Sequence, residues 1–250
     1  MPPVRNPPAP LAPAAEAPNS GGHHRLREMN ALSPPRARLD IDVVYDLVCP
    51  WCYLGVHRLL RALESRPEVS FALRWWPFLL NPDMPQGGLG AADYVSRKWG
   101  GEARARRLQD SIAALGAPLG IDFRFERIRR IPPTVDAHRL VAMAEANGGG
   151  LQAVEALFAA HFSQGRDIGD VAVLLDIAGA CGLDVPAACL LLTSETEAEA
   201  VHTANLRAHR LGVNGVPCFL FGGRFAIAGA QEPDVLERLL DVAVAALREA

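Results

Sequence analysis

Residues 41–60, IDVVYDLVCPWCYLGVHRLL, carry the clearest structural signal in the chain. The β-branched, apolar run 41–45 is typical of a buried strand, which we expect to end near Asp46. After Pro50, apolar residues recur at three- and four-residue steps, a spacing that predicts one apolar face of a helix. These residues are Val56, Leu59, Leu60 and Leu63. A strand therefore leads into a helix across a Cys-Pro-Trp-Cys turn.

A second strand is predicted over residues 69–76, which are rich in aromatic and β-branched side chains. Pro67 separates it from the preceding helix. Strand, helix and strand thus follow one another within about 35 residues, the usual length of a βαβ unit. The two strands should therefore be parallel.

Helical patterns fill the middle of the chain, and strand character returns only near its end. Helices are predicted over 134–147, 151–162, 171–181 and 186–192. The sequence Ser194-Glu195-Thr196-Glu197 has capping-box spacing and should open a helix that reaches about Leu211. Residues 218–221 and 224–228, joined by Gly222-Gly223, predict a β-hairpin. The last helix should begin at Pro233. Its buried face is expected to consist of Leu236, Leu239, Leu240, Ala243 and Leu247.

This order of elements predicts an α/β fold with a four-stranded mixed sheet. We expect residues 39–90 and 195–250 to form the sheet domain, and residues 91–194 to form a helical insertion. Residues 1–38 hold nine of the 20 prolines and have no apolar periodicity. Such a segment buries too little apolar surface to offset its ordering entropy, so we predict a disordered tail.

Composition narrows the functional classes and the compartment. The formal net charge is -3 and acids and bases are mixed along the chain, so nucleic acid is not an expected partner. No stretch reaches 18 apolar residues and no secretory signal is visible, so we expect neither membrane insertion nor export. Five cysteines in 250 residues are too few and too scattered for a secreted disulfide framework. We therefore predict a cytoplasmic protein, kept in a reducing environment.

The strongest chemical signal is Cys49-x-x-Cys52, placed between a strand and a helix. Backbone N–H groups at a helix start favour a thiolate, so Cys49 is the expected nucleophile. Cys52 lies one turn inside the helix and is the expected resolving thiol. A structural zinc site would need a second closely spaced pair of ligands, which the sequence does not offer. The other alternative is that both are ordinary buried cysteines, but the βαβ context favours a redox motif.

The remaining cysteines and histidines are expected to be structural. Cys181 and Cys189 lie in apolar helical runs and should fill the core. His138 and His161 also lie in helical runs, where we expect hydrogen-bonded core or boundary residues. Asp46 could cap the helix or tune the thiols, and capping is the interpretation that we prefer.

The segment DLVCPWCYLG, residues 46–55, resembles the active-site segment of DsbA-like thioredoxin proteins, specifically of their FrnE-type branch. The resemblance covers all of the chain except the tail. It continues, in the family's order, through TVDAHRL at 134–140, GRDI at 165–168, GVPCF at 215–219 and AGAQ at 228–231.

This resemblance implies a thioredoxin fold with a helical insertion domain, and a cis-proline turn at Val216-Pro217 that faces the cysteines. It also implies that the residue before this proline offers its backbone to a bound peptide or thiol, and that the proline keeps metal away from the sulfurs. The substrate-binding residues expected from it are Val216, Pro217, Pro50 and Trp51. The chain departs from the family's common pattern at two places, Pro133 before the middle motif and Cys218 after the proline.

We therefore predict a thiol–disulfide oxidoreductase that acts on disulfide- or thiol-containing proteins or on small thiols. No tightly bound cofactor and no metal are expected, and glutathione is the candidate substrate or reductant. One alternative is a glutathione-dependent isomerase or transferase of the same superfamily, resembling 2-hydroxychromene-2-carboxylate isomerases and kappa-class glutathione transferases, which have a serine where Cys49 stands. Another is a redox-sensing interaction module. The oligomeric state stays open, with a homodimer as one alternative.

Overall fold

The computed structural model of the protein describes residues 38–249, the side chain of Trp99 excepted. The disorder predicted for residues 1–38 therefore lies outside the described residues, apart from Arg38, which begins the first strand. Residues 38–249 lie in one compact unit. The division of this unit into a sheet domain and an insertion domain, with the boundaries given above, stays a prediction.

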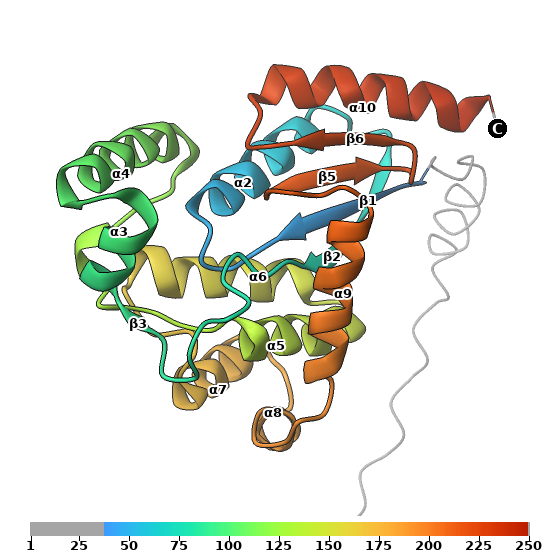
Figure 1. Cartoon of the computed structure of the whole chain (residues 1–250). Helices are drawn as coiled ribbons and strands as arrows, with labels where there is room; N and C mark the ends of the chain where they lie inside the picture. Colours follow the sequence, from blue (N-terminus) through green and yellow to red (C-terminus); the bar gives the residue numbers. More distant parts are fainter. Residues whose placement is uncertain (1–37, 250) are drawn as a thin grey trace, which may run out of the picture. The chain divides into compact units, whose positions relative to one another are not determined.

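A four-stranded mixed sheet lies at the centre of the fold, as the sequence predicted (Figure 1). Its strand order is β2-β1-β5-β6. The strands are β1 (Arg38–Tyr45), β2 (Ser70–Pro77), β5 (Cys218–Phe221) and β6 (Phe225–Ala228). β1 is parallel to β2 and antiparallel to β5, and β5 and β6 form the predicted antiparallel hairpin. The βαβ unit and the hairpin thus meet along β1 and β5.

Both faces of the sheet are covered, which explains why β1 is apolar along nearly its whole length. On one face, Phe219 of β5 lies against Gly55 of the first helix. On the other, Val44 and Cys218 pack against Ala208 of α9. Cys218 is therefore a buried core side chain on the α9 face.

Two helices cover the first face, α2 (Pro50–Glu64) and α10 (Pro233–Arg248), and they pack against each other (Figure 1). Proline occupies the first turn of each, where its missing N–H leaves no hydrogen bond unmade. Leu236, Leu240 and Ala243 are buried as expected. Leu247 is 37% exposed, so the prediction that it faces inward is wrong: it lies in the last turn of the helix, near the end of the chain.

The segment between β2 and β5 is mainly helical. Its helices are α3 (Ala91–Trp99), α4 (Glu102–Gly116), α5 (Val135–Ala146), α6 (Gly150–Phe158), α7 (Val171–Ala180), α8 (Val185–Leu192) and α9 (Ala198–Arg210), with 3₁₀ turns at Ala117–Leu119 and Phe125–Arg127. A π-helical turn, Ala159–Ser163, extends α6. The segment also contains a two-stranded sheet, β3 (Leu89–Gly90) with β4 (Arg130–Ile131), that the helical pattern did not predict. Within residues 38–249, no helix is long and apolar enough to cross a membrane.

The predicted capping box at Ser194 does not form. α9 begins only at Ala198, and its N-cap is Glu197, which has a left-handed backbone and makes no side-chain cap. The hydroxyl of Ser194 instead donates to the carbonyl of Leu191 and accepts from the N–H of Thr196. Ser194 therefore belongs to the end of α8, because its side chain satisfies backbone groups there.

Candidate active site

Cys49 occupies the N-cap of α2, with extended backbone angles of φ -96° and ψ 110°. Its carbonyl oxygen accepts from the N–H groups of Cys52 and Tyr53, which closes the first turn of the helix. The sequence dictates this start, because Pro50 fixes φ for the first helical position and needs no hydrogen-bond acceptor. The sulfur of Cys49 is thereby held at the positive end of the helix dipole.

The loop before β5 faces this sulfur. The bond between Val216 and Pro217 is cis, and the thiol of Cys49 donates to the carbonyl oxygen of Val216 at 3.7 Å. A Cβ on Gly55 would lie only 2.7 Å from the Cγ atom of Pro217, so glycine allows α2 to approach the loop this closely. The two segments, about 165 residues apart in the chain, therefore form one site. The substrate-binding role of Val216 and Pro217 stays a prediction.

Cys52 differs from Cys49 in its surroundings. Its side chain is fully buried, whereas Cys49 is 4% exposed and lines a cavity. Burial raises the pKa of the Cys52 thiol well above its ordinary value, and the neighbouring Cys49 sulfur raises it further. Both residues are free thiols. The pair therefore has one sulfur at the cavity wall and one held protonated behind it.

Asp46 does not cap α2, contrary to our preferred interpretation. The carboxylate is 1% exposed, and its Oδ2 accepts from the N–H of Leu80 at 2.7 Å. Its Oδ1 lies 3.6 Å from Nε2 of His138. The negative charge of Asp46 also contributes to the raised pKa of Cys52. Asp46 thus lies in the core, close enough to Cys52 for its charge to act on that thiol, and its carboxylate is bonded to the backbone that follows β2.

The two helical histidines are buried, but the expectation that they are hydrogen-bonded is wrong within the described residues. His138 and His161 are each 1% exposed, and none of their ring nitrogens has a hydrogen-bond partner. Burial lowers the pKa of His161 to about 4. The backbone of Arg166 and the charge of Asp46 oppose this shift more weakly, and neither completes a hydrogen bond to the ring.

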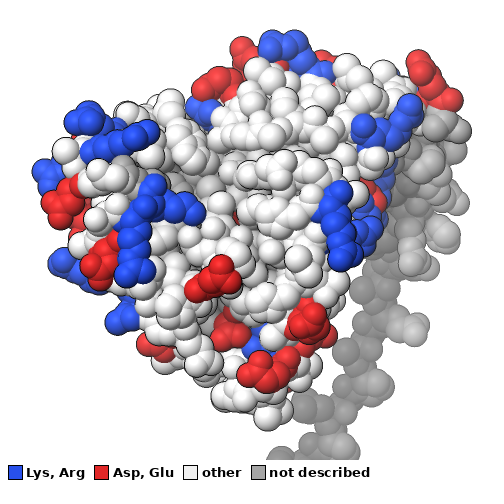
Figure 2. Space-filling model, in the orientation of Figure 1, with Lys and Arg blue, Asp and Glu red and all other residues white. Residues whose placement is uncertain are grey.

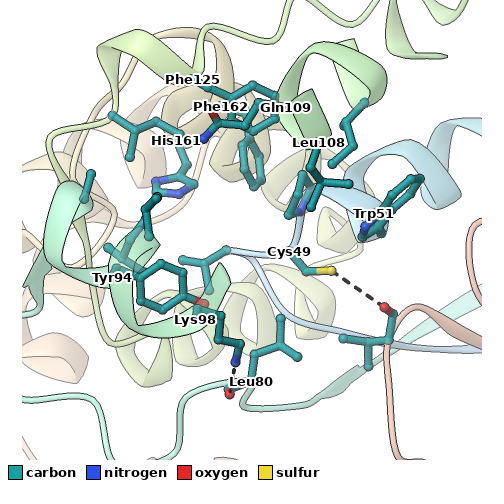
Figure 3. A pocket seen from close by; sticks show the side chains of 18 of the residues that line it. Cys49, Trp51, Leu80, Tyr94, Lys98, Leu108, Gln109, Phe125, His161 and Phe162 are labelled. Carbon is teal, nitrogen blue, oxygen red and sulfur yellow. Dashed lines mark hydrogen bonds between the residues drawn. The ribbon is translucent and has the colours of Figure 1, made fainter. Parts of the chain in front are cut away.

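A cavity of about 250 Å³ opens beside Cys49 (Figure 3). One wall is the active-site turn, with Val48, Cys49, Pro50 and Trp51, and Val216 adds to it. The remaining walls come from the middle of the chain and are mostly apolar. They include Leu80, Tyr94, Leu108, Ile112, Phe125, Ile128, Ile131, His161 and Phe162. Long-range packing of the middle segment against the cysteine turn therefore creates the space.

Few charged side chains lie at the centre of the molecular face seen in Figure 2. Figure 2 shows uncharged surface between α4 and the β5–β6 hairpin, with Lys and Arg gathered over α3 and α4. Lys98 lines the cavity but is exposed, and its ammonium lies 3.3 Å from Oδ1 of Asn81. Among the described residues, no group of three or more His, Cys, Asp or Glu side chains could hold a metal ion.

Comparison with known proteins agrees with this geometry. The family model of the DSBA-like thioredoxin domain matches residues 40–241. The chain belongs to this family. It is also 26% identical over 201 residues to "Uncharacterized protein YwbO" of Bacillus subtilis (strain 168), a match that covers 80% of this chain and 94% of that protein.

Two solved structures extend the similarity to three dimensions. "Probable DsbA oxidoreductase SCO1869" from Streptomyces coelicolor superposes with a TM-score of 0.74 at 27% identity, covering 82% of this chain and 89% of that one. "Cytosolic disulfide reductase DsbM from Pseudomonas aeruginosa with GSH" superposes with a TM-score of 0.57 at 21% identity, covering 81% and 98%. The second likeness shows the shared fold alone. The thioredoxin-like DsbA fold expected from the sequence is confirmed, and the solved structures that share it include oxidoreductases and a 2-hydroxychromene-2-carboxylate isomerase.

The structure brings most of the expected site residues together. Cys49, Pro50, Trp51 and Val216 line one cavity, with Cys52 behind them and Pro217 against α2. Two features were not predicted from the sequence: His161 lines the cavity, and the buried carboxylate of Asp46 accepts from the N–H of Leu80. The Asp46 carboxylate meets a backbone N–H 34 residues away, and no local pattern encodes that contact.

Proposed function

We propose that this protein is a thiol–disulfide oxidoreductase of the FrnE-type branch that exchanges disulfides through Cys49 and Cys52. The observation that carries the proposal is the asymmetry of the pair. Cys49 lies at a helix N-terminus, against a cavity and the Val216 carbonyl, whereas Cys52 is enclosed and has a raised pKa. A nucleophile needs access and a stabilised thiolate, and a resolving thiol needs neither until the mixed disulfide has formed.

In the first step the Cys49 thiolate attacks one sulfur of a substrate disulfide. A bond forms between that sulfur and Cys49, and the second substrate sulfur departs as a thiolate. The helix start supports this step because its N–H groups stabilise negative charge at the Cys49 sulfur in reactant and leaving group alike. Pro50 and Trp51, with Val216 and Pro217 opposite, are the proposed contacts for the substrate.

In the second step Cys52 attacks the Cys49 sulfur of the mixed disulfide. The Cys49–Cys52 bond forms, the first substrate sulfur leaves, and the proton of Cys52 passes to the departing thiolate. The substrate disulfide has then been reduced to two thiols and the enzyme dithiol oxidised to a disulfide. The same steps in reverse oxidise a substrate dithiol.

The proposed partners are disulfide- or thiol-containing proteins and small thiols, with glutathione as the candidate reductant of the oxidised enzyme. The solved DsbM structure, which was determined with GSH, supports glutathione as the first small thiol to test. No metal enters either step. The proposed compartment is the cytoplasm, where thiols are kept reduced.

Turnover of insulin and of glutathione disulfide tests the proposal. The wild-type protein should reduce many equivalents of disulfide per molecule. Cys49→Ser should abolish turnover, whereas Cys181→Ala and Cys189→Ala, which change cysteines away from the site, should retain it. A single equivalent consumed per molecule would refute catalysis and favour a redox-sensing module.

The isomerase alternative makes a different demand on Cys52. A glutathione-dependent isomerase would activate the thiol of bound glutathione, so its rate would not depend on a resolving cysteine. Full isomerisation by Cys52→Ala, with no disulfide turnover by wild type, would replace the oxidoreductase assignment by the isomerase one.

A further inference from the structure

His161 has a position that the exchange chemistry does not explain. It lines the cavity that contains Cys49, it is 1% exposed, and neither ring nitrogen has a hydrogen-bond partner among the described residues. Figure 3 shows its imidazole at the far end of the cavity from Cys49, between Tyr94 and Phe162. An unmade hydrogen bond on a buried polar group costs free energy, so such groups are rare in folded proteins. The imidazole therefore has unused hydrogen-bonding capacity in the wall of a space that a ligand can fill.

The backbone at His161 has an uncommon conformation. Residues Ala159–Ser163 form a π-helical turn that continues α6, and His161 lies at its centre. Such turns are rare and occur frequently at functional sites, because they change the direction in which a side chain points. Here the turn carries the imidazole at the cavity, next to the ring of Phe162 at 4.7 Å.

The walls of the cavity define the chemistry of a ligand. Phe125, Phe162, Ile112 and Leu108 present hydrocarbon. Lowering of the His161 pKa to about 4 leaves the imidazole uncharged at neutral pH, with one nitrogen that donates and one that accepts. Such a ring cannot neutralise a buried carboxylate. The ammonium of Lys98 is exposed, next to the Leu80 carbonyl and the Asn81 side chain, so it lies at the edge of the cavity.

Size sets a second limit. Apolar cavities of about 150 Å³ already admit benzene. A volume of about 250 Å³ therefore accommodates one substituted ring or a branched chain of similar size. Because Cys49 also lines the cavity, an occupant lies beside the cysteine that attacks the substrate.

We infer that the cavity binds an uncharged, mainly apolar group of the substrate, and that His161 hydrogen-bonds a neutral hydroxyl or amide on it. This inference deepens the proposed function and rests on it for the identity of the bound molecule as a substrate. It assigns to His161 a role in substrate specificity at the same site, separate from the chemistry of the two sulfurs.

Binding of redox-inert thioethers tests the inference without any exchange reaction. The probes are 4-(methylthio)phenol, which has a neutral hydroxyl, methyl phenyl sulfide, which lacks it, and 4-(methylthio)benzoate, which is charged. Calorimetric titration of the full-length wild type should show the phenol bound about 3- to 10-fold more tightly than the unsubstituted sulfide, the value of one net hydrogen bond. The benzoate should bind more weakly than the phenol.

Variants of His161 test whether this residue causes the preference for the phenol. His161→Phe should remove the phenol's advantage and keep affinity for methyl phenyl sulfide, while His161→Gln, which still donates and accepts, should restore part of the advantage. Gln152→Leu, at an exposed residue of α6 outside the cavity, should leave the ratio unchanged. Equal affinities of wild type for phenol and unsubstituted sulfide, or a benzoate that binds best, would overturn the inference.

These outcomes are separate from the fate of the proposed function. If the phenol preference depends on His161 but insulin and glutathione disulfide are not turned over, the ligand site stands and the oxidoreductase assignment fails. If disulfides are turned over but the binding of the thioethers does not depend on His161, the oxidoreductase assignment stands and the ligand site fails. A hydroxyaryl group also occurs in tyrosine, so the oxidised Cys-Tyr dipeptide should be compared with bis(4-hydroxyphenyl) disulfide as a turnover substrate to separate a peptide source from a small thiol.

Discussion

Burial of His161 should make folding stability depend on pH between 6.5 and about 4. The pKa of His161 falls from 6.5 to about 4 in the folded protein because the ring is desolvated. Below pH 6.5 the unfolded chain binds a proton that the folded protein does not accept until about pH 4. Stability is therefore fully present above pH 6.5 and is lost as the pH falls toward 4.

The magnitude follows from the size of the pKa change. A difference of about 2.5 pH units corresponds to about 3 kcal/mol of unfolding free energy when the loss is complete. Between pH 8 and pH 5, where most carboxylates stay ionised, the loss from His161 alone is about 2 kcal/mol. His57, whose pKa burial also lowers, acts in the same direction.

Urea denaturation at a series of pH values, for wild type and His161→Gln, isolates this contribution. The variant should lose about 2 kcal/mol less than wild type between pH 8 and pH 5. His57→Gln is the matched control, because it removes a half-buried histidine and keeps the His161 contribution whole. Parallel pH profiles for wild type and His161→Gln would refute the reasoning, since they would mean that the buried ring does not resist protonation.

Two further predictions concern the cysteine turn. Cys52→Ser should accumulate mixed disulfides through Cys49, visible by mass spectrometry as adducts that dithiothreitol releases, because no resolving thiol remains. Gly55→Ala should destabilise the protein by about 1–3 kcal/mol and slow exchange, since its Cβ would lie 2.7 Å from Pro217 Cγ. Gly149→Ala, whose Cβ meets no atom closer than 3.6 Å, should change denaturation midpoint and turnover little. A stable, active Gly55→Ala would show that the loop yields without cost.

Local chemistry explains why part of the fold could be predicted from the sequence. The strand before Asp46, the helix after Pro50 and the Gly222-Gly223 hairpin each depend on neighbours within a few residues. The cis bond at Pro217 was expected from the family resemblance, because the residues alone do not distinguish it from a trans strand start. The sheet and the position of Cys49 could therefore be predicted before the structure was known.

The cavity could not be predicted in this way. Its walls join the cysteine turn to segments from 80 to 162, and the β3–β4 pair consists of two-residue strands, which are too short to show a period. Ser194 illustrates the limit at a single residue: its spacing to Glu197 fits a capping box, yet its hydroxyl is already bonded at the end of α8. The Ser194 hydroxyl could bond either to the end of α8 or to the start of α9, and tertiary packing decides between these two partners.

Substitution of Arg58 tests what holds α2 and the Val216-Pro217 loop together. Its side chain is 6% exposed and donates from Nη1 to the carbonyl of Ala230 at 2.6 Å and from Nη2 to Glu232 at 2.5 Å. These bonds tie the cysteine helix α2 to the loop after β6, whose Gly229 N–H donates to the Pro217 carbonyl. Arg58→Met keeps the aliphatic stem and removes the charged donors, so it should lower the unfolding free energy by about 2 kcal/mol.

A matched pair lies just beyond the C-terminal end of α2. Arg66 also bonds across to α10, at 2.7 Å from Asp241, but its side chain is 21% exposed and the carboxylate 58%. Water competes for this pair, so Arg66→Met should cost less than about 1 kcal/mol. Urea denaturation of both variants gives the two losses of stability, and turnover of glutathione disulfide is measured beside it. Of the two, Arg58→Met should also slow exchange, because Arg58 bonds the loop after β6, which in turn holds the Pro217 carbonyl. Equal losses of stability, or an Arg58→Met protein that turns over at the wild-type rate, would show that packing of Gly55 against Pro217 holds the loop without this bridge.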